Sequence, residues 1–462
     1  MYVADSRAGT PETPAAAPSA DSAARPLAGR RRSAVTPTVL ALGAVSLITD
    51  VSSEMVTAVL PLYLVAGLGL TPLGFGLLDG IYNGFSALVR LVGGHLADRG
   101  GGRHKWVAGA GYALSAACKP LLLVAQTLTP IGLILAADRT GKGLRTAPRD
   151  ALISLSSTPE NRGRAFGVHR ALDTAGALLG PLVAFLILRA TVDGYDAVFT
   201  VSFCVAVVGL LVLVLFVPGG AGTKDGTGRP TGTDADAATG RAGEPGAEAP
   251  ALPALPAPAP RPTLRAALTL LHRPELRRIT VCALLLGLAT VSDSFVFLLL
   301  QRRLGVPDRW FALLPLGTAA AFLLLAVPLG RLADRAGRWR VFLGGHGALL
   351  LAYALLLSSW QGTAAACAVL LLHGGFYAAT DGVLMAAASD SVPRELRSSG
   401  LALVQTGQAL ARFACSLGFG AAWTAWGDRT ALTASAVLLA LCAVFALCLR
   451  PIRPTTLSEG LV

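Results

Sequence analysis

Long apolar runs alternate with short polar connections along most of this chain. Runs of about 20 residues suffice to cross the hydrocarbon core of a membrane, and the pattern predicts twelve such helices in two sets of six. We therefore expect an all-α membrane protein made of two six-helix bundles. The helices are expected at about 37–66, 73–97, 106–127, 130–156, 164–189 and 196–217, and then at about 276–301, 308–332, 341–360, 363–390, 397–424 and 430–449.

A charged connection occurs at the same place in each half. Residues 94–105 read GHLADRGGGRHK and residues 330–340 read GRLADRAGRWR, so both contain Gly-x-Leu-Ala-Asp-Arg. The charges and free backbone groups of such a connection are costly inside lipid, which places each one at a membrane face. Its return between apolar runs predicts an internal duplication and hence two pseudo-symmetric bundles.

These connections resemble the loops between helices 2 and 3 and between helices 8 and 9 of the major facilitator superfamily (MFS) of secondary transporters. The resemblance covers nearly all of the chain between about 37 and 450, and it implies the MFS fold and transport by alternating access. We expect Asp98 to act as a conformational latch against a helix start near 393–397 in the other half. The residues that carry the resemblance, and the expected latch, are Gly94, Asp98, Arg99, Arg103 and Lys105, with Gly330, Asp334, Arg335, Arg338 and Arg340.

Two further phrases match the superfamily. Arg139, Gly143 and Ala147 resemble its helix 4 phrase, whose arginine is implicated in proton handling, although Lys142 and Arg145 make this face more basic than the usual pattern. On the fifth helix a Gly-x8-Gly-x3-Gly-Pro phrase resembles that of drug/proton-antiporter-like members. Small residues at this spacing also permit close helix packing, so the phrase has two interpretations. Its residues are Gly167, Gly176, Gly180 and Pro181.

Composition supports a polytopic membrane protein. Only 14% of the 462 residues are charged, against about 25% in soluble domains. The net charge of +12 comes from arginines at alternate helix ends, which is the positive-inside pattern and does not indicate nucleic-acid binding. Both termini are therefore expected in the cytoplasm and the protein in the plasma membrane. The seven cysteines lack CxxC spacing, so we expect neither a metal nor another cofactor.

Segments rich in Gly, Pro, Ala and Thr divide the chain. We expect a disordered cytoplasmic tail at 1–34, the first bundle at 35–217, a flexible cytoplasmic linker at 218–263, the second bundle at 264–450 and a cytoplasmic tail at 451–462. Such composition cannot form a packed core.

Many polar residues fall inside the predicted spans. A charge near the middle of a membrane costs about 2.5–3.5 kcal/mol, so these residues are expected to face a polar interior. They form either a proton-coupling and substrate cavity or an ion-pair network that only holds helices together. The candidates are Asp50, Glu54, Asp79, Arg90, Lys119, Asp138, Arg139, Lys142, Arg145, His169, Arg170, Asp173, Asp293, Asp381, Gln405, Gln408 and Arg412.

The spacing of the residues indicates which helix face they share in two of these groups. Asp138, Lys142, Arg145 and Arg149 recur at intervals that put them on one helix face. Asp50 and Glu54 lie one turn apart, where two carboxylates in a low dielectric disfavour each other's ionised form. We therefore expect that pair to exchange a proton during transport.

The leading hypothesis is a transporter of a small molecule that acts as a monomer, exchanging its cargo for protons and exporting it. The alternative is a proton-coupled importer of an anionic or zwitterionic nutrient, which Lys119, Lys142, Arg145 and Arg170 favour. A transport-inactive membrane receptor or assembly partner is a third class. Because HExxH and GxSxG motifs are missing from the sequence, an enzyme is not expected.

Overall fold

The computed structural model describes residues 36–99, 104–158, 161–191, 194–218, 272, 274–390, 392 and 397–449. Within these ranges the side chains of 86–88, 90–99, 382, 386, 387, 389, 390, 397–400 and 402 fall outside the description. So do both predicted tails and nearly all of the predicted linker.

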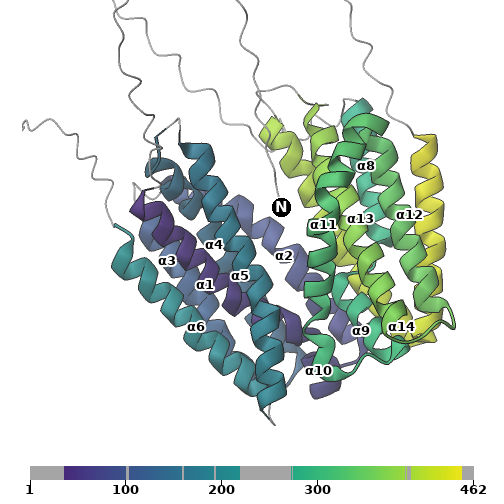
Figure 1. The fold of residues 1–462 in the computed structure, drawn as a ribbon, viewed down its shortest axis with the longest axis horizontal. Coiled ribbons are helices and arrows are strands. Elements are labelled where there is room, and N and C mark those ends of the chain that lie inside the picture. Colours follow the sequence, from purple (N-terminus) through teal and green to yellow (C-terminus); the bar gives the residue numbers. More distant parts are fainter. Residues whose placement is uncertain are drawn as a thin grey trace, which may run out of the picture.

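The first half of the chain forms one bundle of long helices (Figure 1). Prolines that begin α1 and α2 suit the first turn of a helix, where their missing N–H has no partner to lose. The elements are α1 (Pro37–Leu62), its π-helical continuation η1 (Tyr63–Gly67), α2 (Pro72–Arg99), α3 (His104–Val124), α4 (Leu128–Leu155), α5 (Arg162–Ala190) and α6 (Gly194–Phe216).

The second half forms the other bundle. The helix expected at 276–301 is broken at 290–292, and the one expected at 308–332 is broken at 312–313, so neither is the continuous helix predicted. The two expected at 397–424 and 430–449 are both present and meet at a kink at Gly427. The elements are α8 (Pro274–Ala289), α9 (Asp293–Leu304), α10 (Asp308–Phe311), α11 (Leu314–Ala336), α12 (Arg338–Leu357), α13 (Thr363–Asp390) and α14 (Arg397–Cys448).

The α8–α9 break and the α14 kink each have a local cause. At the α8–α9 break, Val291 N–H donates to the hydroxyl of Tyr353 on α12 at 2.8 Å, so a backbone group freed by the break is still paired. In α14 the chain kinks at Gly427, whose φ of 83° suits a residue without Cβ.

Nine helical stretches within the described ranges are long and apolar enough to cross a membrane. The last of them, Leu403–Cys448, has 46 residues, enough for two crossings at 1.5 Å per residue. α2 and α4 fall outside this set because polar and charged residues recur along them. The two helices pack closely on each other, and α2 also packs on α14 of the second bundle.

The two bundles converge at one end and diverge at the other (Figure 1). We name the end at which α1 and α8 begin the near end, and the opposite end, which holds α9 and α10, the far end. At the far end the rings of Phe185 and Trp310, from opposite bundles, lie 5.2 Å apart. The structure is therefore closed at the far end.

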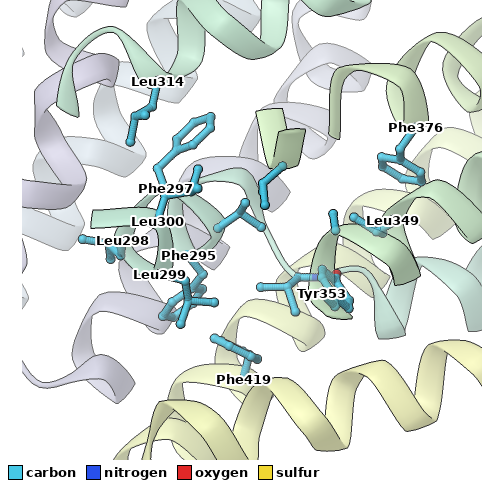
Figure 2. Close-up of a cluster of buried hydrophobic side chains, with 14 of the residues drawn as sticks. Phe295, Phe297, Leu298, Leu299, Leu300, Leu314, Leu349, Tyr353, Phe376 and Phe419 are labelled. Carbon is cyan, nitrogen blue, oxygen red and sulfur yellow. The ribbon is translucent and has the colours of Figure 1, made fainter. Parts of the chain in front are cut away.

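A large apolar cluster around α9 supports this closure (Figure 2). The ring of Phe295 lies 4.9 Å from that of Phe75 on α2 and 4.8 Å from that of Phe419 on α14. Burial of such aromatic contacts stabilises the bundle contact beyond the area removed from lipid and water. The broken helix is thus held firmly where it meets the first bundle.

Candidate functional site

A cavity of about 380 Å³ lies between the two bundles. That volume falls in the range typical of small-molecule sites. Its walls come from α1 and α2 on one side and from the α8–α9 break, α9, α11, α13 and α14 on the other, so a bound molecule would touch both halves. The lining residues are Glu54, Thr57, Pro61, Tyr82, Asn83, Thr290, Val291, Ser292, Asp293, Ser294, Phe297, Pro315, Thr318, Ala319, Phe322, Tyr377, Asp381 and Arg412.

The charged part of this lining is dominated by carboxylates. Glu54 comes from the first bundle, and Asp293 and Asp381 come from the second. Arg412 is the one cation among the lining residues. With all four groups ionised the wall carries a net negative charge, which attracts cations and protons.

Asp293 is the best defined of these carboxylates. It begins α9, where the helix dipole favours a negative charge. The hydroxyl of Tyr377 donates a hydrogen bond to its Oδ1, and Nε2 of the fully buried His373 lies 3.5 Å from the same oxygen. Because 46% of the Asp293 side chain is exposed, the carboxylate contacts Tyr377 and His373 on one side and is open to the cavity on the other.

The first bundle carries a chain of ion pairs beside the cavity. Arg145 of α4 lies 3.4 Å from Asp50 of α1. One turn earlier, Lys142 Nζ lies 3.7 Å from Glu54 Oε1. Two members of the predicted charged face of α4, Lys142 and Arg145, are therefore directed at α1, and Glu54 is the member of these ion pairs that also reaches the cavity.

The chain of ion pairs continues to α5. Arg149 lies 3.6 Å from Asp173, whose Oδ1 also accepts a hydrogen bond from Ser46 at 2.7 Å. Arg149 also lies 3.1 Å from Asp150, its neighbour on α4. The pairs tie α1, α4 and α5 together.

Asp138 and Arg139 form a separate pair where α3 meets α4. Arg139 Nη2 lies 2.6 Å from Asp138 Oδ2, and Ser115 donates to the other carboxylate oxygen. The guanidinium also stacks 3.7 Å from the ring centre of Tyr82, which lines the cavity. Lys119 is buried beside this pair, with Nζ 3.3 Å from the Ser115 carbonyl.

Replacing Asp138 with asparagine is expected to destabilise the protein by about 3–5 kcal/mol, because it leaves the buried Arg139 without its carboxylate. The measurement is the thermal unfolding temperature in detergent. Asp150→Asn is the matched control, since its side chain is 43% exposed and such pairs contribute about 0–1 kcal/mol. Equal losses in the two variants would contradict the structural role of the Asp138 pair.

Other predicted residues lie apart from the cavity. Gln405 and Gln408 are half-buried on α14, His169 is buried on α5, and Arg170 is exposed. Asp79 is buried where α2 meets α14. The side chains of Arg90, Asp98 and Arg99, with Gly94 and Arg103, fall outside the described part of the chain.

The predicted latch residues of the second half lie at the near end of α11. Asp334 and Arg335 are exposed there, one to two turns after Gly330. Their place near the end of a helix agrees with a connection at a membrane face. The expected contact of Asp98 with 393–397 stays a prediction, since both segments lack described side chains.

The glycine phrase on α5 lies partly against α1. A Cβ on Gly176 would stand 2.4 Å from the Leu47 carbonyl oxygen, and one on Gly180 would stand 2.6 Å from Cβ of Glu54. A Cβ on Gly167 would meet no atom within 4 Å. Two of the three glycines therefore serve close packing, and Gly180 also fixes the backbone that carries Glu54.

Sequence reasoning missed most of the uncharged lining. Tyr82 and Tyr377 look like ordinary core aromatics within apolar runs. A usable signal was present at 290–294, where TVSDS places four polar residues in a predicted span. In a membrane helix such a cluster indicates a break that lines a cavity.

Two bundles of membrane-crossing helices around a shared cavity define a multi-pass membrane transporter. The sequence profile of the Major Facilitator Superfamily matches residues 42–412 and, in a second match, 311–460. The chain belongs to this superfamily, and its fold is the MFS fold. It is accordingly a secondary transporter of a small molecule, and not an enzyme.

Relatives and solved structures agree with this assignment. An uncharacterized MFS-type transporter of Methanocaldococcus jannaschii is 27% identical over 414 residues, which cover 87% of this chain and 92% of that protein. A putative uncharacterized MFS-type transporter of Mycobacterium tuberculosis is 33% identical over 34% of this chain and 35% of its own length.

The likeness to solved structures concerns the fold. The crystal structure of the nucleoside transporter NupG aligns with a TM-score of 0.71 at 12% identity, covering 90% of this chain and 99% of that one. A bacterial homolog of the human lysosomal transporter Spinster aligns with a TM-score of 0.67 at 15% identity, covering 89% and 96%.

Proposed function

We propose that this protein is a proton-coupled antiporter that exports a small molecule with a positively charged group. The observation that carries the proposal is the cavity lining, in which Glu54, Asp293 and Asp381 face Arg412. Carboxylates at the wall stabilise a cationic group, and the neighbouring arginine can donate hydrogen bonds to a carboxylate or another acceptor on the same cargo.

The same lining favours exchange over joint transport. A carboxylate that holds a proton is neutral and loses its attraction for a cation, so protons and cationic cargo compete for these groups. Competition at one site, combined with access that alternates between the two membrane faces, produces antiport. The helix 5 phrase adds support for an exporter through its resemblance to antiporter members.

The lining gives less support to the importer of an anionic nutrient. That alternative depended on Lys119, Lys142, Arg145 and Arg170, and none of these four lines the cavity. Lys142 and Arg145 are instead committed to Glu54 and Asp50.

We also propose that the near end faces the cytoplasm of the cell that carries this protein in its plasma membrane. Arginines of the near-end connections, such as Arg162 and Arg340, support this orientation. The arginines at the far end depart from the rule that positive charges gather on the cytoplasmic side. Among them, Arg303 forms an ion pair with Asp428 of α14 at 3.0 Å. A paired arginine of this kind has a structural reason to lie there.

Proteoliposomes test the proposal directly. With an acidic lumen, adding a cationic compound that is cargo should release protons from the vesicles, because each inward movement of cargo drives a proton out. A set of cationic, zwitterionic and anionic compounds of one size is compared against protein-free vesicles. Proton movement only with anions, or cargo entry accompanied by protons, would contradict cationic antiport.

A further inference from the structure

Asp79 is a buried carboxylate at the seam between the two bundles. It lies on α2 with 5% exposure. Its Oδ2 accepts a hydrogen bond from Ser416 Oγ of α14 at 2.7 Å, and its Oδ1 accepts one from Asn83 Nδ2 at 3.2 Å. Both partners are neutral, and the Ser416 bond joins the first bundle to the second.

The seam around Asp79 is packed too closely to admit bulk water. A Cβ on Gly76 would stand 2.4 Å from the Ser416 carbonyl oxygen, and one on Gly80 would stand 2.9 Å from the Phe413 ring. Toward the far end, Leu73 N–H donates to Thr424 Oγ1 at 2.9 Å. Far-end closure therefore shuts Asp79 away from the solution on that side.

The charges near Asp79 do not balance it. Among the described side chains, no lysine or arginine lies within 4.0 Å of its carboxylate, in contrast to Asp138 with Arg139. α9 presents Asp293 to it, which is a like charge. α14 presents Cys415, whose thiol donates to the Thr290 carbonyl at 3.1 Å.

The charged groups of the remaining neighbouring elements are already engaged with other partners. On α4, Arg139 is paired with Asp138 and stacked on Tyr82. On α1, Glu54 faces Lys142.

The arginines of the two seam helices stand at other levels along these helices than Asp79. Arg412 lies one turn from Ser416 on α14 but borders the central cavity beside Asp381. On α2 itself, Arg90 follows Asp79 by eleven positions, about 16 Å along the helix axis.

An ionised carboxylate in such a setting is strongly disfavoured, because desolvation is not repaid by a nearby cation. A protonated Asp79 instead donates from Oδ2 to Ser416 Oγ across the same short distance, since a hydroxyl can accept as well as donate. We propose that Asp79 is a proton-binding site that holds the far end closed while it is protonated and lets it open once the proton leaves.

A route for the proton is built into the fold. A small cavity of about 20 Å³ beside Asp79 is bordered by Thr57, Tyr82 and Ser294, which also line the central cavity. This volume exceeds the 10–15 Å³ or so that one water needs, and the site has polar partners for it. A single water in this small cavity would link Asp79 to the central cavity while the far end is closed.

This inference rests on the proposed proton-coupled exchange, and it names the lock that such an exchange would use. The test measures the far-end separation of the two bundles by electron paramagnetic resonance. Spin labels are attached to unnatural amino acids at the exposed positions Thr191 and Gln361, which leaves the seven cysteines in place. In the unsubstituted protein the distance should lengthen as the pH rises from about 5 to about 9.

Asp79→Asn mimics the protonated group. The far-end distance between the spin labels should therefore stay short throughout this pH range, so that the pH-dependent change in distance is completely lost. Asp150→Asn removes a carboxylate that is 43% exposed and lies outside the seam, and it should keep the pH-dependent change in distance. A pH-independent distance in the unsubstituted protein, or a retained shift in Asp79→Asn, would overturn the lock. If Asp79→Asn does not fold, the same measurement is made on Asp79→Ser, which also lacks the carboxylate and should likewise lose the pH-dependent change in distance.

Failure of the proposed function has a different signature. It would show as absent cargo-driven proton movement in proteoliposomes, whatever the spin-label distances do. A pH-dependent far-end distance that vanishes with Asp79 would support the lock even then.

Discussion

Glu54→Gln is expected to abolish transport driven by a pH gradient while leaving cargo counterflow measurable. Glu54 is the first-bundle carboxylate that lines the central cavity, and its Oε1 lies 3.7 Å from Lys142 Nζ. Glutamine keeps the size and the hydrogen-bonding oxygen but cannot take up a proton. Cargo binding should weaken without being lost, because Asp293 and Asp381 still face the cavity.

The measurement compares uptake into proteoliposomes with and without a pH gradient, and exchange of labelled for unlabelled cargo at equal pH. Asp50→Asn is the informative comparison one helical turn earlier. Asp50 is 8% exposed, lies outside the cavity lining and is held by Arg145 at 3.4 Å. Its replacement should reduce both transport modes and the unfolding temperature together. A full response of Glu54→Gln to the pH gradient would contradict its role in coupling.

The different surroundings of Asp50 and Glu54 could not be predicted from the sequence. The spacing of Asp50 and Glu54 correctly placed both on one side of α1, and from the sequence they formed one coupling unit. The structure gives each a different α4 cation and brings only Glu54 to the cavity. Glu54 packs closely against Gly180 of α5, and a contact between helices so distant in sequence is not encoded in a local pattern.

The fold was predictable for a simple physical reason. A helix must satisfy its own backbone in lipid, so run length and charge-rich connections nearly determine the crossings. The α8–α9 break escaped the prediction because its backbone is satisfied by Tyr353 from α12, a contact distant in sequence. The boundary predicted between 424 and 430 is confirmed, because the two halves of α14 meet at the kink of Gly427.

The two bundles use their charges differently. In the first, α4 cations are paired with carboxylates of α1, α4 and α5. In the second, Asp293, Asp381 and Arg412 all face the cavity. Ion pairs of the first kind stiffen a bundle, whereas open charges of the second kind can exchange partners with cargo. The sequence pattern was densest in the first bundle, but the groups available to cargo lie mainly in the second.

A side chain added at Gly420 is expected to prevent far-end closure. A Cβ there would stand 2.4 Å from the Pro72 carbonyl oxygen and 3.2 Å from Cα of Gly76, both on α2. Overpacking of this kind costs about 1–3 kcal/mol, so Gly420→Val should lower the population of the closed far end by roughly 5- to 150-fold. Because alternating access requires that state, transport should fall by a similar factor.

Gly418→Val is the matched control on the same helix, since a Cβ at Gly418 would meet no atom within 4 Å. It makes the same chemical change on α14 and should leave transport and far-end distances near their original values. Both variants are first checked for monodisperse elution in detergent, which separates a shifted conformation from misfolding. Spin labels at Thr191 and Gln361 should then report a longer far-end distance in Gly420→Val at every pH. A short distance with normal transport in that variant would mean that the α2–α14 contact at Gly420 does not govern closure.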